Sequence, residues 1–157
     1  MRCKDPRFKP RGKLIGDFDS NIERVAQMRL ELDALRLVVY NAAETIDLFG
    51  PKAGKRAIAQ CKILVPAGIE HIINECMQVW GGQGVTNEHS PMPQLWAYAR
   101  WARLADGPDA AHRHQVGRDE LKKGEEITKR HQRYNALAME FAEKSGHKII
   151  MMPEDSL

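Results

Sequence analysis

Apolar side chains recur every three or four residues through two long stretches in the first half of the chain, the spacing of one face of an α-helix. The first stretch follows Ser20 and Glu23, whose separation predicts a capping box at a helix start. It consists of Val25, Met28, Leu32, Leu35, Val39, Ala42 and Ile46. The pattern predicts a helix from Ser20 to about Leu48. Gly50-Pro51 ends it and begins the next helix, because proline is tolerated in a first helical turn.

The second stretch predicts a helix from about Lys52 to Trp80. Its apolar stripe consists of Ile58, Cys61, Val65, Ile69, Ile72, Cys76 and Val79. Pro66 lies inside this helix and predicts a kink, because proline removes one backbone hydrogen bond. The two apolar stripes can be buried from water only if the two helices pack against each other. The expected core residues are therefore Val25, Leu32, Val39, Val65, Ile69 and Ile72.

Two further helices follow. Ser90-Pro91 predicts the start of a third, with serine as the N-cap and proline at the first helical position. A turn at Asp106-Gly107-Pro108 then leads into a fourth, which runs to about Lys144 and ends at Gly146. The first half of this last helix carries few apolar residues, which indicates a surface helix. No segment reads as a strand, so we predict an all-α fold, an antiparallel four-helix bundle.

Composition limits the class of protein. At 157 residues the chain fits one domain. Its net charge of +3 is too small to suggest nucleic acid as a partner. Its three cysteines match no metal or redox spacing, which favours reduced thiols inside the cell. No apolar run approaches the roughly 20 residues of a membrane span.

Three regions are expected along the chain. A basic N-terminal arm occupies residues 1–17, the helical bundle residues 18–146, and a C-terminal tail residues 147–157. A basic arm could serve as a targeting segment or as a phosphate-binding tail. Its prolines interrupt any amphipathic helix, so a solvated terminus is the favoured interpretation.

The segment from Gln78 to Thr86 is the strongest candidate for function, with glycine at three of its nine positions. Glycine ends helices without steric cost, so a helix end followed by a turn is the simpler interpretation. The alternative is a ligand site, in which the bare backbone offers N–H groups to an anion. Histidines with metal-ligand spacing and nucleophile motifs are missing, which argues against a metal site and a hydrolase.

Five separated motifs, in the right order, resemble the C-terminal helical domain of the acyl-CoA dehydrogenases. The match spans roughly residues 12–121 and includes the branch with Leu-Ala-Asp-Gly-Pro-Asp in place of Tyr-Glu-Gly-Thr. The motifs are Gly12-Lys13-Leu14, residues 29–37 with Asn41-Ala42-Ala43, Ile58-Ala59-Gln60-Cys61-Lys62 through Pro66, residues 78–85, and Arg103-Leu104-Ala105-Asp106-Gly107-Pro108-Asp109 with His112.

The resemblance implies FAD-dependent desaturation of acyl-CoA thioesters. Gln78, Gly81 and Gly82 then contact the adenosine pyrophosphate half of FAD, often that of a neighbouring subunit, and Gly84 shapes the loop. Asp106 is then the catalytic base, although its local sequence alone favours a helix cap. A homo-oligomer, an electron acceptor of unstated identity and a mitochondrial or peroxisomal location, otherwise cytoplasmic, are also implied.

The chain departs from the family pattern in several places. The usual Arg-x-x-Phe-Gly is replaced by Phe8-Lys9-Pro10-Arg11-Gly12, so the FAD-contacting arginine has no clear match. Phe18-Asp19 and Ala110 stand where the family has other residues. The family's N-terminal helical and middle β-domains have no counterpart in the 157 residues. A non-catalytic helical module for oligomerisation therefore stands beside the enzyme hypothesis.

Overall fold

A computed structural model describes residues 2–146, which contain four α-helices, four short 3-10 helices and no strand. The α-helices are α1 (Asp19–Phe49), α2 (Pro51–Trp80), α3 (Met92–Ala102) and α4 (Asp109–Ser145). The 3-10 helices are η1 (Arg2–Lys4), η2 (Pro10–Gly12), η3 (Ile15–Asp17) and η4 (Gly81–Val85). The predicted all-α class is confirmed, and the four predicted helices have nearly the predicted limits.

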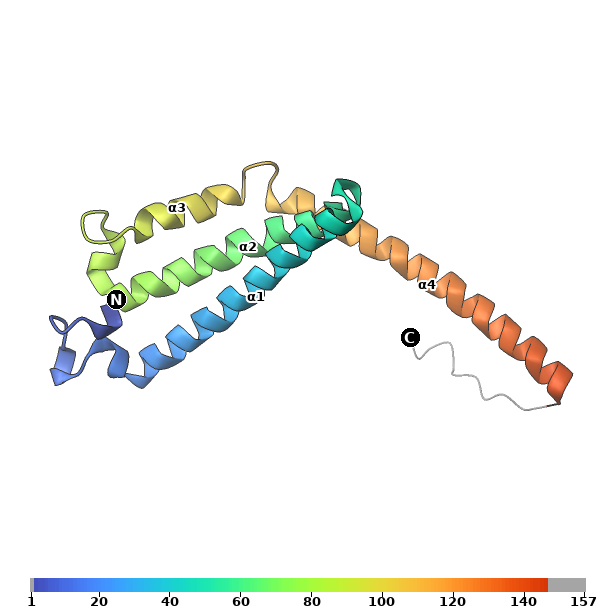
Figure 1. The fold of residues 1–157 in the computed structure, drawn as a ribbon, viewed down its shortest axis with the longest axis horizontal. Coiled ribbons are helices and arrows are strands. Elements are labelled where there is room, and N and C mark those ends of the chain that lie inside the picture. The colour runs from blue at the N-terminus through green and yellow to red at the C-terminus, as the bar shows by residue number, and fades with distance from the viewer. Residues whose placement is uncertain (1, 147–157) are drawn as a thin grey trace. The chain divides into compact units, whose positions relative to one another are not determined.

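Helices α1 and α2 form an antiparallel hairpin, and α3 returns along α2 (Figure 1). Gly50 makes the first reversal with a φ of 82°, and its N–H donates to the Ile46 carbonyl oxygen at 2.8 Å. Pro51 occupies the first turn of α2, as predicted. The Ser145–Gly146 end of α4 is also as predicted, with Gly146 at a φ of 69°.

The seam between α1 and α2 is made by small residues. A Cβ atom on Gly54 would lie 2.5 Å from Cγ1 of Ile46, and one on Gly68 would lie 2.6 Å from Cδ1 of Leu35. The buried apolar residues of the described chain are Ala42, Ala57, Ala59, Ile73 and Ala99. Small side chains at the contact let the two helix backbones approach closely.

The predicted core is therefore only partly right. Val25 is 45% exposed and Val39 43% exposed, so their predicted burial is wrong. Leu32, Val65, Ile69 and Ile72 are half-buried. The physical reason is the seam: glycine and alanine occupy the closest contact, and the larger side chains flank it with one side uncovered.

The predicted capping box is also wrong. Helix α1 begins at Asp19, so Ser20 lies inside its first turn and no side chain caps the start. The Phe18 carbonyl oxygen accepts from the amides of Asn21 and Ile22 instead. At the third helix, Pro91 is the N-cap and Met92 is the first helical residue, so the predicted positions of Ser90 and Pro91 are each one residue off. The Met92 amide still donates to Ser90 Oγ at 3.3 Å.

Helix α2 continues through Pro66, as predicted, and the kink stays a prediction. The chain divides into two compact units, Met1–Val116 and Gly117–Leu157, and this boundary falls within α4. The predicted tail, residues 147–157, lies outside the described residues. Among the helices described, none is both long and apolar enough to span a membrane.

Candidate functional site

The glycine segment lies where α2 ends. Gln78 is exposed in the last turn of α2, and Gly81 follows with a φ of 68°, which favours glycine. The Gly81 N–H donates to the Met77 carbonyl oxygen at the end of α2. A Cβ atom on Gly81 or on Gly82 would meet nothing within 4 Å, so the backbone at these two glycines faces open space. The predicted helix end is confirmed, and the ligand site stays a prediction, with an accessible backbone at these two glycines.

Gly84 has a different role from its neighbours. It is buried, and a Cβ atom there would lie 2.8 Å from both the Met77 carbonyl oxygen and Cβ of Trp80. Its own carbonyl oxygen accepts from Ser90 Oγ at 3.1 Å, and Ser90 is only 5% exposed. Gly84 thus packs the segment onto α2, and Ser90 ties it to the start of α3.

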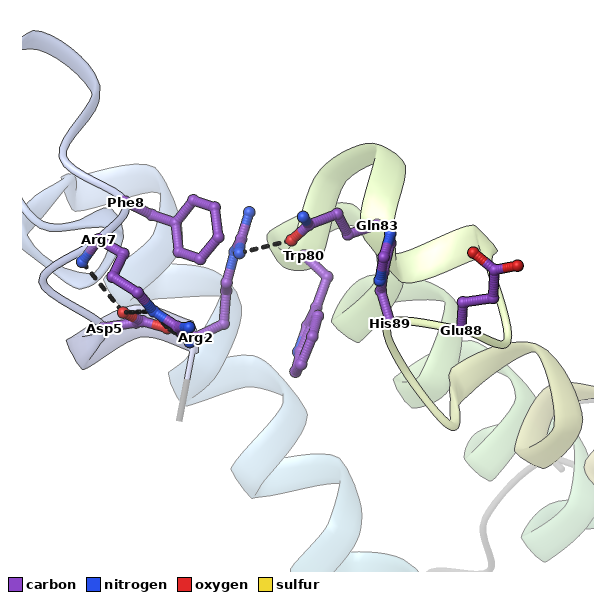
Figure 2. Close-up of a pocket in the computed structure, with 8 residues that line it drawn as sticks. All are labelled: Arg2, Asp5, Arg7, Phe8, Trp80, Gln83, Glu88 and His89. Carbon is purple, nitrogen blue, oxygen red and sulfur yellow. Dashed lines mark hydrogen bonds and ion pairs between the residues drawn. The ribbon is translucent and has the colours of Figure 1, made fainter.

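The N-terminal arm closes a cavity against this segment (Figure 2). The cavity encloses about 410 Å³ and is lined by Arg2, Asp5, Arg7, Phe8, Trp80, Gln83, Glu88 and His89. Arg2 Nη1 donates to Gln83 Oε1 at 2.9 Å. The Arg2 guanidinium lies 3.1 Å from the ring centroid of Phe8 and 5.7 Å from that of Trp80. The arm is therefore folded against the glycine segment rather than solvated throughout.

The charged side chains that line the cavity are Arg2, Arg7, Asp5 and Glu88, two basic and two acidic. Arg7 binds Asp5 through both carboxylate oxygens, with Nη2 to Oδ2 at 2.7 Å and Nε to Oδ1 at 3.0 Å. Side-chain hydrogen bonds from Arg7 lower the pKa of Asp5 to about 2, so this pair is ionised and mutually neutralised. Arg2 donates instead to the neutral amide of Gln83, and its charge adds to the lowering of the Asp5 pKa.

Asp106 lies at the other end of α3, in the turn before α4. It is exposed and has a φ of 54°, the left-handed region. Within residues 2–146 its carboxylate makes no hydrogen bond or ion pair, which does not support the helix-cap interpretation. Helix α3 has 11 residues, so its length separates Asp106 from the glycine segment by roughly 16 Å at 1.5 Å per residue.

The structure thus brings Gln78, Gly81, Gly82 and Gly84 together and keeps Asp106 apart from them. Sequence reasoning missed the contributions of Arg2, Trp80 and Gln83 to a cavity. Arg2 and Gln83 are 81 positions apart, and no local signal relates them. In the part of the chain that is described, no group of three or more histidine, cysteine or acidic side chains is placed to hold a metal ion.

Comparison with known proteins settles the family. Residues 7–121 match the family described as "Acyl-CoA dehydrogenase, C-terminal domain". The chain belongs to this family. The match covers the arm from Arg7, the helices α1 to α3 and the start of α4, and therefore both the glycine segment and the Asp106 turn.

Individual relatives agree. Over 116 residues the chain is 34% identical to the Arabidopsis thaliana protein named probable acyl-CoA dehydrogenase IBR3. The matched region is 74% of this chain and 14% of the relative. It is 34% identical over 111 residues to mouse acyl-CoA dehydrogenase family member 10, covering 71% of this chain and 10% of the relative. A Mycobacterium abscessus structure named as an acyl-CoA dehydrogenase superposes with a TM-score of 0.72 at 35% identity, over 78% of this chain and 29% of that chain.

These figures confirm the predicted domain type. They also show that the chain spans between about a tenth and a third of the proteins it matches. Family members are in general FAD-containing flavoproteins that desaturate acyl-CoA. The part of α4 after Leu121 lies beyond the family match.

Proposed function

We propose that this chain serves as the C-terminal domain of an FAD-dependent acyl-CoA dehydrogenase, which forms an α,β double bond in acyl-CoA thioesters. The observation that carries the proposal is the open backbone of Gly81 and Gly82 beside a cavity that holds the Arg2 guanidinium. An anionic cofactor needs close backbone approach and a cation, and this corner of the fold offers both.

The residues present fit the adenosine pyrophosphate half of FAD. Gln78, Gly81 and Gly82 would hold it from the glycine segment, and Arg2 would add the positive charge that the altered Phe8-Lys9-Pro10-Arg11-Gly12 motif does not supply. Phe8 and Trp80 provide apolar ring surface in the same cavity. When bound, FAD supplies the hydride acceptor of the reaction. Gly84 acts by packing, since its buried position leaves no room for a side chain.

Asp106 is the proposed general base. Its carboxylate is exposed at the end of α3, and it would take the α-proton of the thioester. The side chain is one methylene shorter than the glutamate more usual in the family. The substrate therefore has to approach the Asp106–Gly107 backbone closely. Gly107 helps, because it carries no side chain beside the carboxylate.

The separation of Asp106 from the glycine segment supports an oligomeric arrangement. With α3 between them, the two parts of one chain are positioned to serve different regions of an active site, or the active sites of neighbouring subunits. The family forms oligomers in general. We therefore propose a homo-oligomer in which the glycine segment of one subunit reaches the cofactor of the next.

The second candidate function is a non-catalytic helical module that oligomerises. It is favoured by large apolar side chains that stay exposed on the first unit, such as Leu37 at 68%, Phe49 at 72% and Trp101 at 65%. Such a module would keep the fold without binding a flavin. The flavin absorbance of the purified chain separates the two candidates.

The test has two steps. First, FAD is titrated into the chain and into the Arg2→Gln variant, and binding is followed by flavin fluorescence; the variant is expected to bind more weakly. Second, Asp106→Asn is introduced into the chain joined to the amino-terminal part of a full-length relative. Turnover is expected to fall by about 10²–10⁴-fold with FAD retained.

Asp106→Glu is the matched control, because it keeps a carboxylate at this position and is expected to retain turnover. Unchanged turnover in Asp106→Asn would remove Asp106 as the base. Absence of FAD binding by both the chain and the joined protein would favour the non-catalytic module.

A further inference from the structure

Lys62 of α2 reaches across to the end of α3. Its Nζ donates to the carbonyl oxygens of Ala102 at 3.0 Å and Ala105 at 2.6 Å, and the side chain is half-buried. The last carbonyls of a helix have no partner within the helix, and a cation there also meets the negative end of the helix dipole. Lys62 thus ties the end of α3 to the middle of α2.

Arg103, within the turn after α3, forms ion pairs with both α2 and α4. Its Nη1 lies 2.9 Å from Glu70 Oε2 on α2, and its Nη2 lies 2.7 Å from Asp109 Oδ2 in the first turn of α4. The side chains of Glu70 and Asp109 are only 19% and 14% exposed, so both contacts are largely withdrawn from water. The turn between α3 and the start of α4 is therefore anchored to α2 at two points.

Asp106 sits inside this anchored turn with its backbone held on both sides. The carbonyl before it, on Ala105, receives the shorter Lys62 hydrogen bond, and its own carbonyl oxygen lies 3.3 Å from Nε2 of His112. Its left-handed φ of 54° is uncommon for a residue other than glycine and persists only where the surroundings hold it. The backbone is thus fixed while the carboxylate faces solvent.

We propose that Lys62 is a positioning residue for Asp106, because its ammonium fixes the peptide that precedes the carboxylate-bearing residue. The proposal rests on the role of Asp106 as the base given above. A base is effective only within reach of its proton, so the turn must be held to a fraction of an ångström. Lys62 acts on Asp106 through the backbone carbonyls of Ala102 and Ala105 that its ammonium holds.

The first measurement uses the chain itself. Amide hydrogen exchange is followed at Leu104 and Ala105, whose N–H groups donate to the Trp101 carbonyl at 2.8 Å and 3.1 Å. Lys62→Met is expected to speed exchange at these amides by about tenfold or more, as a locally opened turn does, while the amides of α1 keep their protection. Lys62→Arg keeps the positive charge and several N–H donors, so it is expected to restore the slow rates.

Lys55→Met is the matched control, since Lys55 is an exposed lysine on the same helix. It is expected to leave exchange at Leu104 and Ala105 unchanged. Should Lys62→Met lose its helical circular dichroism, Lys62→Gln, a smaller change in polarity, takes its place. Unchanged exchange in a folded Lys62 variant overturns the proposal.

The second measurement uses the joined protein described above. Lys62→Met is expected to lower kcat by about 10- to 100-fold, the cost of misplacing a catalytic group by about 1 Å, while KM and flavin absorbance stay unchanged. A kcat equal to that of the unmodified protein, with Asp106→Asn strongly impaired, overturns the positioning role. If Asp106→Asn itself leaves turnover unchanged, the base assignment fails and the positioning role fails with it. Altered exchange at Ala105 would then still show the tie between α2 and α3.

Discussion

Gly84 packs directly on the Met77 carbonyl group, so that a methyl group at residue 84 would stand 2.8 Å from that oxygen. Real Cβ atoms do not approach backbone oxygen so closely, and the oxygen belongs to the last turn of α2. The contact explains why the third glycine of the segment is needed even though it is buried and faces no ligand.

Gly84→Ala is therefore expected to destabilise the chain by about 1–3 kcal/mol, the usual cost of overpacking. Gly82→Ala is the matched control: a Cβ atom there meets nothing within 4 Å, and Gly82 does not have a positive φ. It is expected to be neutral or to stabilise by about 0.4–1 kcal/mol through the unfolded state. Urea unfolding followed by circular dichroism measures both, and equal losses in the two variants would contradict this role for Gly84.

Among residues 2–146, Ile73 is the largest of the buried side chains, with 8% of its surface exposed. Ile73→Ala is expected to cost about 2–5 kcal/mol of unfolding free energy, because it removes buried methylenes and leaves a cavity. Leu37, which is 68% exposed on α1, is the comparison. Leu37→Ala is expected to change stability by no more than about 0.5 kcal/mol in the monomeric chain. A large loss at Leu37 would show that this face is covered in solution.

Self-association is expected through the exposed apolar surface of α1. Leu30 and Leu37 lie seven residues apart, hence on the same side of the helix, and are 67% and 68% exposed. Light scattering of the chain is expected to show a closed oligomer, and the double variant Leu30→Glu, Leu37→Glu is expected to shift it toward monomer with its helical spectrum intact. Lys52→Glu, an exposed charge change on α2, serves as control. A strictly monomeric chain at high concentration would count against the oligomer and against cofactor sharing.

The Asp5–Arg7 pair should be visible in a pH titration. Arg7 lowers the pKa of Asp5 from 3.8 to about 2, so the folded state favours the ionised carboxylate. A depressed folded-state pKa gives a stabilising contribution that is present above the unfolded pKa and is lost as pH falls toward 2. Arg7→Gln is expected to return the pKa of Asp5 toward 3.8, as measured by carboxyl carbon NMR. Arg11→Gln, an exposed arginine of the same arm, should leave it near 2, and a common shift in both variants would indicate general charge rather than the direct contact.

Local signals in the sequence determined the helices and their ends. Gly50, Gly81 and Gly146 mark helix ends with positive φ values of 82°, 68° and 69°, a conformation that glycine adopts without steric cost. The family was also readable from sequence, because several motifs occur in order. The predicted Ser20 cap was wrong because the helix begins two residues earlier, where the Phe18 carbonyl oxygen accepts the first backbone hydrogen bonds. Backbone hydrogen bonding, and not a side-chain cap, sets this helix start.

Only the tertiary structure decided which residues form the seam and which ones build the site. An apolar stripe marks the face of a helix, but the depth of each residue depends on how closely the partner approaches. Gly54 and Gly68 allow an approach that moves Val25 and Val39 to the edge. Likewise Arg2 meets Gln83 across 81 positions, and Lys62 meets Ala105 across 43. Such contacts depend on the packing of whole helices, which periodicity along the chain does not encode.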